Sequence, residues 1–363
     1  MNDGLRWLDC DMHMAEPWNL WHRYVDPRFR GDIEALTGVP EGYNPLTHGP
    51  AANIREIRQT RVHLFDDYLG PDGVSIDAAG QLRAMDREGI DAAILFPTIA
   101  LSSPRTADPD AAMAVRRAFN DWLHEFCAFD PSRLKLNAVI ATGDAVAAAK
   151  EIRRARQELG AVSILLDPRP DGAPFDDPVY EPIWAAAEEV GLAVDFHNGI
   201  PRQMEARYGD RPTHLFVHAS ARPVGHMCTF MELLVGGVLE RHPRLRVAFL
   251  ECGASWVPYW LFRLEEECEK FRSRHPGIDE NVRLRPVEYW RRQCFCSVEV
   301  SEWTLPGVIA TIGDDNLVVS SDFPHFDSEF PEAGRHFVSL EGVSRAAKQK
   351  IMWDNCARLY GLD

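Results

Sequence analysis

The sequence predicts a (β/α)8 TIM barrel with insertions after strands 1 and 5, and three observations lead to this expectation. Eight short runs of β-forming residues recur along the 363-residue chain, and most are followed by a segment with helical periodicity. The runs are apolar without strict alternation, as strands buried on both faces require. Acidic and imidazole residues stand where several runs end, the face on which such barrels build their sites.

The expected strands are defined by these apolar runs and the turn residues around them. They cover residues 7–11, 92–97, 134–141, 162–166, 192–196, 245–250, 295–300 and 317–320. Because helical stretches alternate with them, the connections are of the crossover type that joins parallel strands.

The expected helices are recognised by their periodicity and their ends. Asp108 is a suitable N-cap with Pro109 at the first helical position of a helix running to Phe129. Three further helices each stop just before a glycine suited to end them, at residues 81–88, 144–159 and 182–190. A terminal helix over residues 344–360 closes the chain.

Two segments fit this alternation poorly. Residues 23–75 are rich in proline and glycine, and residues 199–243 separate the fifth and sixth strands. Both are expected to be insertions on the face that carries the site. Since there is no internal repeat, low-complexity tract or linker, we expect one domain over residues 1–363.

The amino-acid composition argues against some classes of binding partner. The net charge of −16, from 39 basic and 55 acidic residues, argues against nucleic acid or an anionic membrane. No apolar run approaches the roughly 20 residues that span a bilayer, and no secretory signal is visible. Eight cysteines without a CxxC pair are expected to be reduced thiols. A cytoplasmic enzyme with a small-molecule substrate is the expectation.

The chemistry is expected where polar residues follow strands. Any one aspartate there is commonly a helix cap, and any one histidine commonly a core residue. Together, carboxylates and imidazoles at neighbouring strand ends stay unsatisfied unless a cation sits among them. Two histidines and two carboxylates suit zinc, iron, manganese or cobalt. The candidate ligands are Asp11, His13, His197 and Asp322, with Glu16, Glu251 and His325 close by in the sequence.

The segments 9–17, 245–260 and 320–325 resemble the amidohydrolase superfamily. More narrowly, they resemble the amidohydrolase-related branch that contains aminocarboxymuconate-semialdehyde decarboxylase and the resorcylate decarboxylases. The likeness runs nearly end to end, to residues 355–360. It implies the same four metal ligands, and a further histidine that polarises substrate or water. His218 is the best match for that histidine, with His214 as its rival.

One departure from the family pattern concerns the metal. The family's familiar first ligand is histidine, whereas this chain has Asp11 before His13. An additional negative ligand makes the ion less Lewis acidic, so zinc is not assumed. Iron and manganese stay open, as does a second ion.

The resemblance implies a metal-dependent hydrolase or a non-oxidative decarboxylase of a small carbonyl or carboxylate compound. Asp322 would act as general base and His218 as acid or electrophile. The alternative is a non-haem di-iron oxygenase similar to the two-subunit aminoisobutyrate hydroxylase. Its second ion would use surplus residues that otherwise orient the ligand histidines, namely Glu16, His218, Glu251 and His325. A non-catalytic partner subunit would have lost a ligand, yet all four are present.

Substrate contacts are expected from aromatic residues near the strand ends. Trp18, Trp21 and Trp256 are candidates for an apolar pocket, with core packing as the alternative. Arg222 is a candidate for pairing a substrate carboxylate, with an ordinary surface arginine as the alternative. The resemblance implies a homo-oligomer, and a hetero-oligomer remains open.

Overall fold

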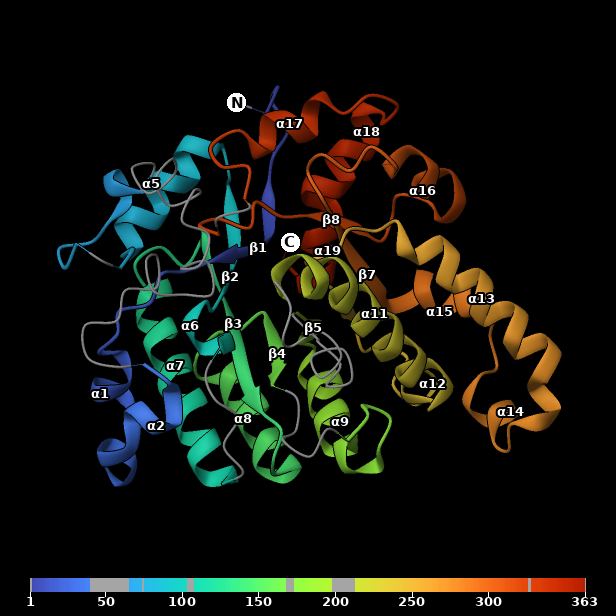
Figure 1. Ribbon diagram of the computed structural model, residues 1–363, viewed down its shortest axis with the longest axis horizontal. Helices are drawn as coiled ribbons and strands as arrows, with labels where there is room; N and C mark the ends of the chain where they lie inside the picture. The colour runs from blue at the N-terminus through green and yellow to red at the C-terminus, as the bar shows by residue number, and fades with distance from the viewer. Residues whose placement is uncertain are drawn as a thin grey trace.

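A computed structural model describes residues 2–39, 65–73, 75–102, 108–167, 173–197, 213–325 and 328–362. Eight parallel strands follow one another in chain order around a nearly closed barrel (Figure 1). They are β1 (Leu8–His13), β2 (Ala92–Phe96), β3 (Leu134–Ala141), β4 (Ser163–Asp167), β5 (Ala193–Phe196), β6 (Val247–Phe249), β7 (Cys294–Val298) and β8 (Leu317–Val319). The predicted barrel is therefore confirmed, with each strand at its expected place.

Helices surround the barrel on its outside (Figure 1). They are α1 (Leu20–Tyr24), α2 (Ile33–Thr37), α5 (Ala78–Glu88), α6 (Ile99–Ser102), α7 (Pro109–Cys127), α8 (Ala145–Gln157), α9 (Glu181–Val190), α11 (Thr213–Val235), α12 (Val238–Arg241), α13 (Trp256–Phe271), α14 (Ile278–Asn281), α15 (Pro286–Gln293), α16 (Leu305–Ile312), α17 (Ala333–Ser339), α18 (Arg345–Gln349) and α19 (Asn355–Tyr360). No helix in the described ranges combines the length and apolarity that crossing a bilayer requires.

The helix ends follow the chemistry expected from the sequence. The Asp108 carboxylate accepts hydrogen bonds from the backbone nitrogens of Asp110 and Ala111, and so begins α7. Helix α5 begins three residues earlier than predicted, because Asp77 accepts from the Gly80 nitrogen. It ends at Gly89, whose φ of 82° lies in the left-handed region.

The C-terminal segment is more irregular than the single helix expected over residues 344–360. Between α18 and α19 lies one wide π turn, Lys350–Asp354. The turn places Asn355 against the end of the barrel, where its amide donates 2.7 Å hydrogen bonds to the carbonyls of Asp314 and Leu317. This tertiary contact accompanies the local departure from α-helical spacing.

Most of the described part of the second expected insertion is helical. Residues 213–241 form α11 and α12, so α11 is the helix that connects β5 to β6. Pro223 within α11 masks its helical pattern in the sequence. The helix packs through residues such as Phe230, whose ring meets Phe249 of β6. In the first insertion, α1 and α2 are helical, and residues 40–64 lie outside the described ranges.

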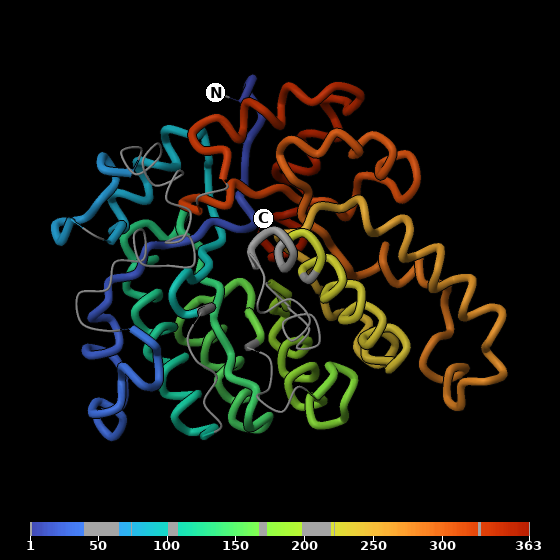
Figure 2. Tube along the Cα trace, viewed as in Figure 1, coloured from blue at the N-terminus to red at the C-terminus, as the bar shows by residue number. Residues whose placement is uncertain are grey.

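The barrel closes between β1 and β8 at the end that carries the polar residues. The Asp322 nitrogen donates to the Asp11 carbonyl at 3.2 Å, and the His13 nitrogen donates to the Phe323 carbonyl at 2.6 Å. The Asp9 carboxylate reinforces this seam by accepting from the Ser321 nitrogen at 3.1 Å. The blue N-terminal strand accordingly lies beside the red C-terminal part of the chain (Figure 2). The seam thus brings residues 11–13 next to residue 322.

Candidate metal centre

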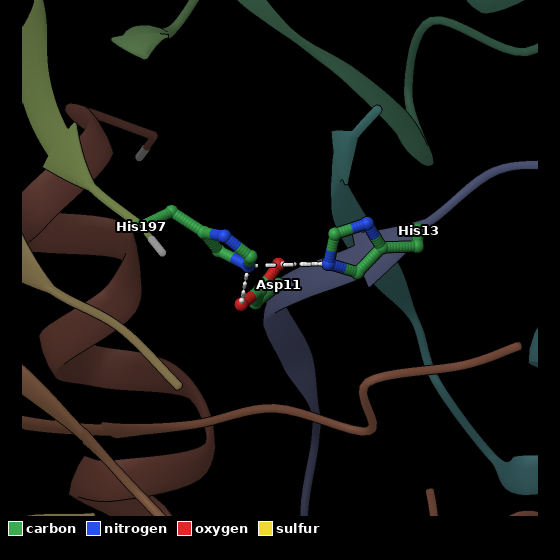
Figure 3. Close-up of side chains that lie close together, drawn as sticks. All are labelled: Asp11, His13 and His197. Atoms are coloured by element: carbon green, nitrogen blue, oxygen red, sulfur yellow. Dashed lines mark hydrogen bonds and ion pairs between the residues drawn. The ribbon is translucent and has the colours of Figure 1, made fainter. Parts of the chain in front are cut away.

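Three side chains converge at the carboxyl ends of β1 and β5 (Figure 3). Nε2 of His13 lies 3.3 Å from Oδ1 of Asp11, and Nε2 of His197 lies 3.1 Å from Oδ2 of the same carboxylate. The two Nε2 atoms are 3.2 Å apart. All three residues are buried. Their ligand atoms lie close enough together to hold one metal ion.

The hydrogen bonding of His13 determines which ring nitrogen is available. Nδ1 of His13 lies 2.8 Å from the carbonyl oxygen of Pro97, which only accepts. Nδ1 therefore carries the proton, and Nε2 of the neutral ring presents a lone pair towards Asp11 and His197. A backbone carbonyl that orients a metal-binding histidine in this way is a common arrangement.

The electrostatics of this group favour a cation. Burial lowers the pKa of His197 to about 4, so its imidazole is neutral at pH 7. Burial opposes ionisation of Asp11, but the two imidazoles outweigh it and hold the pKa of Asp11 below its usual range. Within the described residues, the Asp11 oxygens meet only these two rings. One buried carboxylate with two imidazoles fits a divalent ion well.

A second group overlaps the first. Oδ1 of Asp322 lies 3.5 Å from Nε2 of His13 and 2.8 Å from Nδ1 of His325. These three residues also have ligand atoms within reach of one ion. Asp322 has a φ of 53°, a left-handed conformation that is uncommon for residues other than glycine. Such local strain is typical of functional sites.

Glu251 enters the same region through a reversal of its backbone. Phe249 faces the outer helices, where its ring packs against Trp290 of α15, so a regular strand would also turn residue 251 outwards. The φ of Glu251 is 63°, and its Oε2 instead lies 3.4 Å from Nε2 of His197. Its Oε1 forms an ion pair with Arg222 of α11 and lies 4.0 Å from Nδ1 of His325.

Arg222 therefore contacts a carboxylate of the protein itself. The sequence analysis offered it as a partner for a substrate carboxylate, with an ordinary surface residue as the alternative. Its side chain is only 14% exposed. An isolated surface role is thus wrong, and Arg222 belongs to the polar wall of the site.

Glu16 has a supporting position beside the centre. Its carboxylate accepts hydrogen bonds from the backbone nitrogens of Thr98, Ile99 and Ala100, at 2.9 to 3.3 Å. It therefore fixes the segment after β2, directly beyond the Pro97 carbonyl that orients His13. Glu16 belongs to neither group of potential metal ligands among the described residues.

The predicted aromatic contacts lie at different depths. Trp21 is fully buried in the hydrophobic core, and Trp256 packs against Phe249 and Trp290. Trp18 is half-buried and packs against His22. The ring that meets the centre is Phe96 of β2, stacked on His197 with centroids 5.4 Å apart. His218 falls within α11, but its side chain and that of His214 lie outside the described part.

Sequence reasoning missed two supporting groups. Asp9 accepts from the nitrogens of Asp11 and Ser321 and thereby ties both sides of the seam. Its place two residues before Asp11, facing the same side of a strand, was a usable signal. The Pro97 carbonyl had no such signal, because a backbone oxygen carries no side-chain signature.

Comparisons with known proteins agree with this architecture. A family model described as Amidohydrolase matches residues 9–362. The chain is 27% identical to gamma-resorcylate decarboxylase of a Rhizobium species over 307 residues, which cover 78% of this chain and 86% of that protein. It is 25% identical to 2-amino-3-carboxymuconate-6-semialdehyde decarboxylase of Dictyostelium discoideum, with 78% and 76% covered.

The fold also matches solved structures. One is 5-carboxyvanillate decarboxylase of Novosphingobium aromaticivorans, crystallised with manganese and 4-hydroxy-3-methoxy-5-nitrobenzoic acid. The TM-score is 0.76 with 21% identity, over 99% of this chain and 97% of that one. At this identity, the likeness concerns the fold.

Proposed function

The chain belongs to the amidohydrolase family, and from this premise we propose that it is a divalent-metal-dependent, non-oxidative decarboxylase of a small aromatic carboxylate. The observation that carries the proposal is the buried group of Asp11, His13 and His197 with Asp322 beside it. The relatives named above are decarboxylases of carboxylated aromatic or muconate compounds.

The proposed ligands are Asp11, His13, His197 and Asp322. A divalent ion held by these residues would supply positive charge for orienting the substrate carboxylate. Manganese is the first choice for experiments, because carboxylate and imidazole ligands suit it and the Novosphingobium enzyme was crystallised with it.

The residues around the ion have separate tasks in this proposal. Glu251 and Arg222 neutralise each other, so the guanidinium would not compete for the anionic substrate. Asp322 shares its Oδ1 with Nδ1 of His325 at 2.8 Å. We assign to this pair the proton that replaces carbon dioxide on the ring carbon when the carbon–carbon bond breaks. Phe96 supplies an apolar wall beside His197.

The test is product analysis with the manganese-loaded protein. Phenolic acids such as 2,6-dihydroxybenzoate and 5-carboxyvanillate should release carbon dioxide and the decarboxylated phenol. In deuterated water, the product should carry deuterium at the vacated ring position. Asp322→Asn should abolish release, whereas Asp108→Asn, a change at a helix cap, should not. If the fully metal-loaded protein releases no carbon dioxide from any phenolic acid, the proposal is wrong.

A second candidate, a di-iron oxygenase, is favoured by one observation. His13, Asp322 and His325 form a second potential ligand group that overlaps the first, and Glu251 lies at its edge. Metal analysis of protein purified without oxygen decides the matter. Two irons per chain with oxygen uptake on adding an aliphatic amino acid would favour it over decarboxylation. A hydrolase would use the same single ion, and would be recognised by a product that has gained water.

A further inference from the structure

Two cysteines meet behind the wall of the candidate site. Cys252 follows Glu251 directly, and Cys296 lies on the neighbouring strand β7. Both sulfurs contact the carbonyl oxygen of Gly253, at 3.6 Å from Cys252 and 3.3 Å from Cys296. The two thiols therefore share one backbone acceptor. They are residues far apart in sequence that the barrel brings side by side.

The pair faces the helix layer rather than the barrel interior. Cys296 is in register with Phe249, whose ring packs against Trp290 and Phe230 on the outer helices. The indole of Trp256 and the imidazole of His226 lie near this pair. The reaction proposed above uses none of these groups. The thiols therefore form a separate cluster with no assigned role.

We propose that Cys252 and Cys296 are a redox-active pair that closes to a disulfide when the protein meets a hydroperoxide. Cys252 is the first sulfur to react, because its residue is less buried than Cys296. Its thiol reduces hydrogen peroxide, releases water and becomes a sulfenic acid. The Cys296 sulfur then attacks the Cys252 sulfur, the sulfur–oxygen bond breaks, and the hydroxyl leaves with the thiol proton as water. Two electrons pass from the sulfurs to the peroxide.

The turn that carries Cys252 makes closure consequential for the site. The Glu251 nitrogen donates to Oγ of Ser297 on β7 at 2.9 Å. Two residues beyond Cys252, the Ala254 nitrogen donates to the Glu302 carboxylate at 3.1 Å. A bond from Cys252 to β7 therefore acts on a short, tethered turn. Among the residues next to Cys252, Glu251 has a left-handed backbone and therefore the least freedom to adjust when the disulfide forms.

The experiment is peptide mapping of the full-length, metal-loaded protein after treatment with hydrogen peroxide. We expect a cross-link between the peptide containing Cys252 and the peptide containing Cys296. The mass of the cross-linked species should be lower by two hydrogen atoms than the summed masses of the two free peptides. A dithiol reductant should reverse it. Cys294 is the matched control, since it is buried on the same strand two residues earlier and lies in the same tryptic peptide.

The variants separate the outcomes. Cys294→Ala should keep the cross-link, and Cys296→Ala should lose it while Cys252 is trapped as a sulfenic acid by a dimedone probe. A cross-link that survives in Cys296→Ala, or Cys252 oxidised no faster than buried Cys127, would overturn the proposal. Since the readout is the cross-link itself, it is independent of whether the protein is a decarboxylase. Oxidised wild type should lose manganese that oxidised Cys296→Ala retains, and equal retention in both would contradict the effect on the site.

Discussion

Nε2 of His13 and Nε2 of His197 face each other at 3.2 Å, with the Asp11 carboxylate within 3.3 Å of both rings. The Pro97 carbonyl accepts a hydrogen bond from Nδ1, the other ring nitrogen of His13. Nε2 of His13, which faces His197, is therefore a hydrogen-bond acceptor. The Asp11 carboxylate beside it is an acceptor as well. This arrangement is stabilised when a cation occupies the space between them.

Replacing His197 by alanine should strip the metal from the protein. The loss should exceed the roughly 10–100-fold fall in affinity that removal of an orienting partner causes. Metal content measured by plasma mass spectrometry after dialysis is the readout. His124→Ala, on α7 outside the cluster, is the control and should keep its metal. Full metal content in His197→Ala would remove that residue from the ligand set.

Glu16→Gln should weaken metal binding without direct contact to the ion. The change removes the negative charge that strengthens three backbone hydrogen bonds just after Pro97. The carbonyl that orients His13 then loses its anchor, and we expect affinity to fall about 10-fold or more. A chelator competition titration measures this. Asp108→Asn alters a comparable carboxylate cap on α7, and equal losses in both variants would contradict the specific role of Glu16.

Glu88 should make stability depend on pH. Burial raises its pKa to about 7 from the ordinary 4.5. Between these values the folded protein binds a proton that the unfolded chain releases, so this group's contribution to the free energy of unfolding falls as pH rises. The slope is at most about 1.4 kcal/mol per pH unit. Glu88→Gln preserves the shape of the side chain but cannot ionise. Denaturant melts should therefore show the free energy of unfolding of this variant rising relative to that of the wild type between pH 5 and pH 8. If the difference in the free energy of unfolding between variant and wild type stays constant across that range, the raised pKa assigned to Glu88 is wrong.

Gly80→Ala should destabilise the fold, although alanine ordinarily favours a helix. An added Cβ would lie 1.9 Å from the Tyr68 carbonyl oxygen, so α5 must shift. Overpacking of this kind costs about 1–3 kcal/mol. Gly307 of α16 has nothing within 4 Å of a Cβ, and Gly307→Ala should instead stabilise by roughly 0.5–1 kcal/mol. Chemical denaturation of both variants tests the contrast, and a shift of the same sign in both would contradict it.

The sequence alone indicated the barrel and the strand ends that carry Asp11, His13, His197 and Asp322. These features depend on local regularities: apolar strands that alternate with helices, and a two-residue period that turns Asp11 and His13 to the same side. Parallel strands then place their carboxyl ends on one face of the barrel. The N-cap of α7 was likewise readable, because Asp108 bonds to backbone groups two and three residues away.

Tertiary structure decided the features that depend on partners distant in the chain. The Pro97 carbonyl selects the tautomer of His13, and backbone nitrogens after β2 engage Glu16. The pairing of Cys252 with Cys296 arises only because β6 and β7 are neighbours. Glu251 reaches His197 only because a positive φ reverses the direction that strand periodicity assigns to it. Sequence periodicity reports regular backbone, whereas these contacts depend on backbone oxygens, backbone nitrogens and one left-handed residue that leave no periodic pattern.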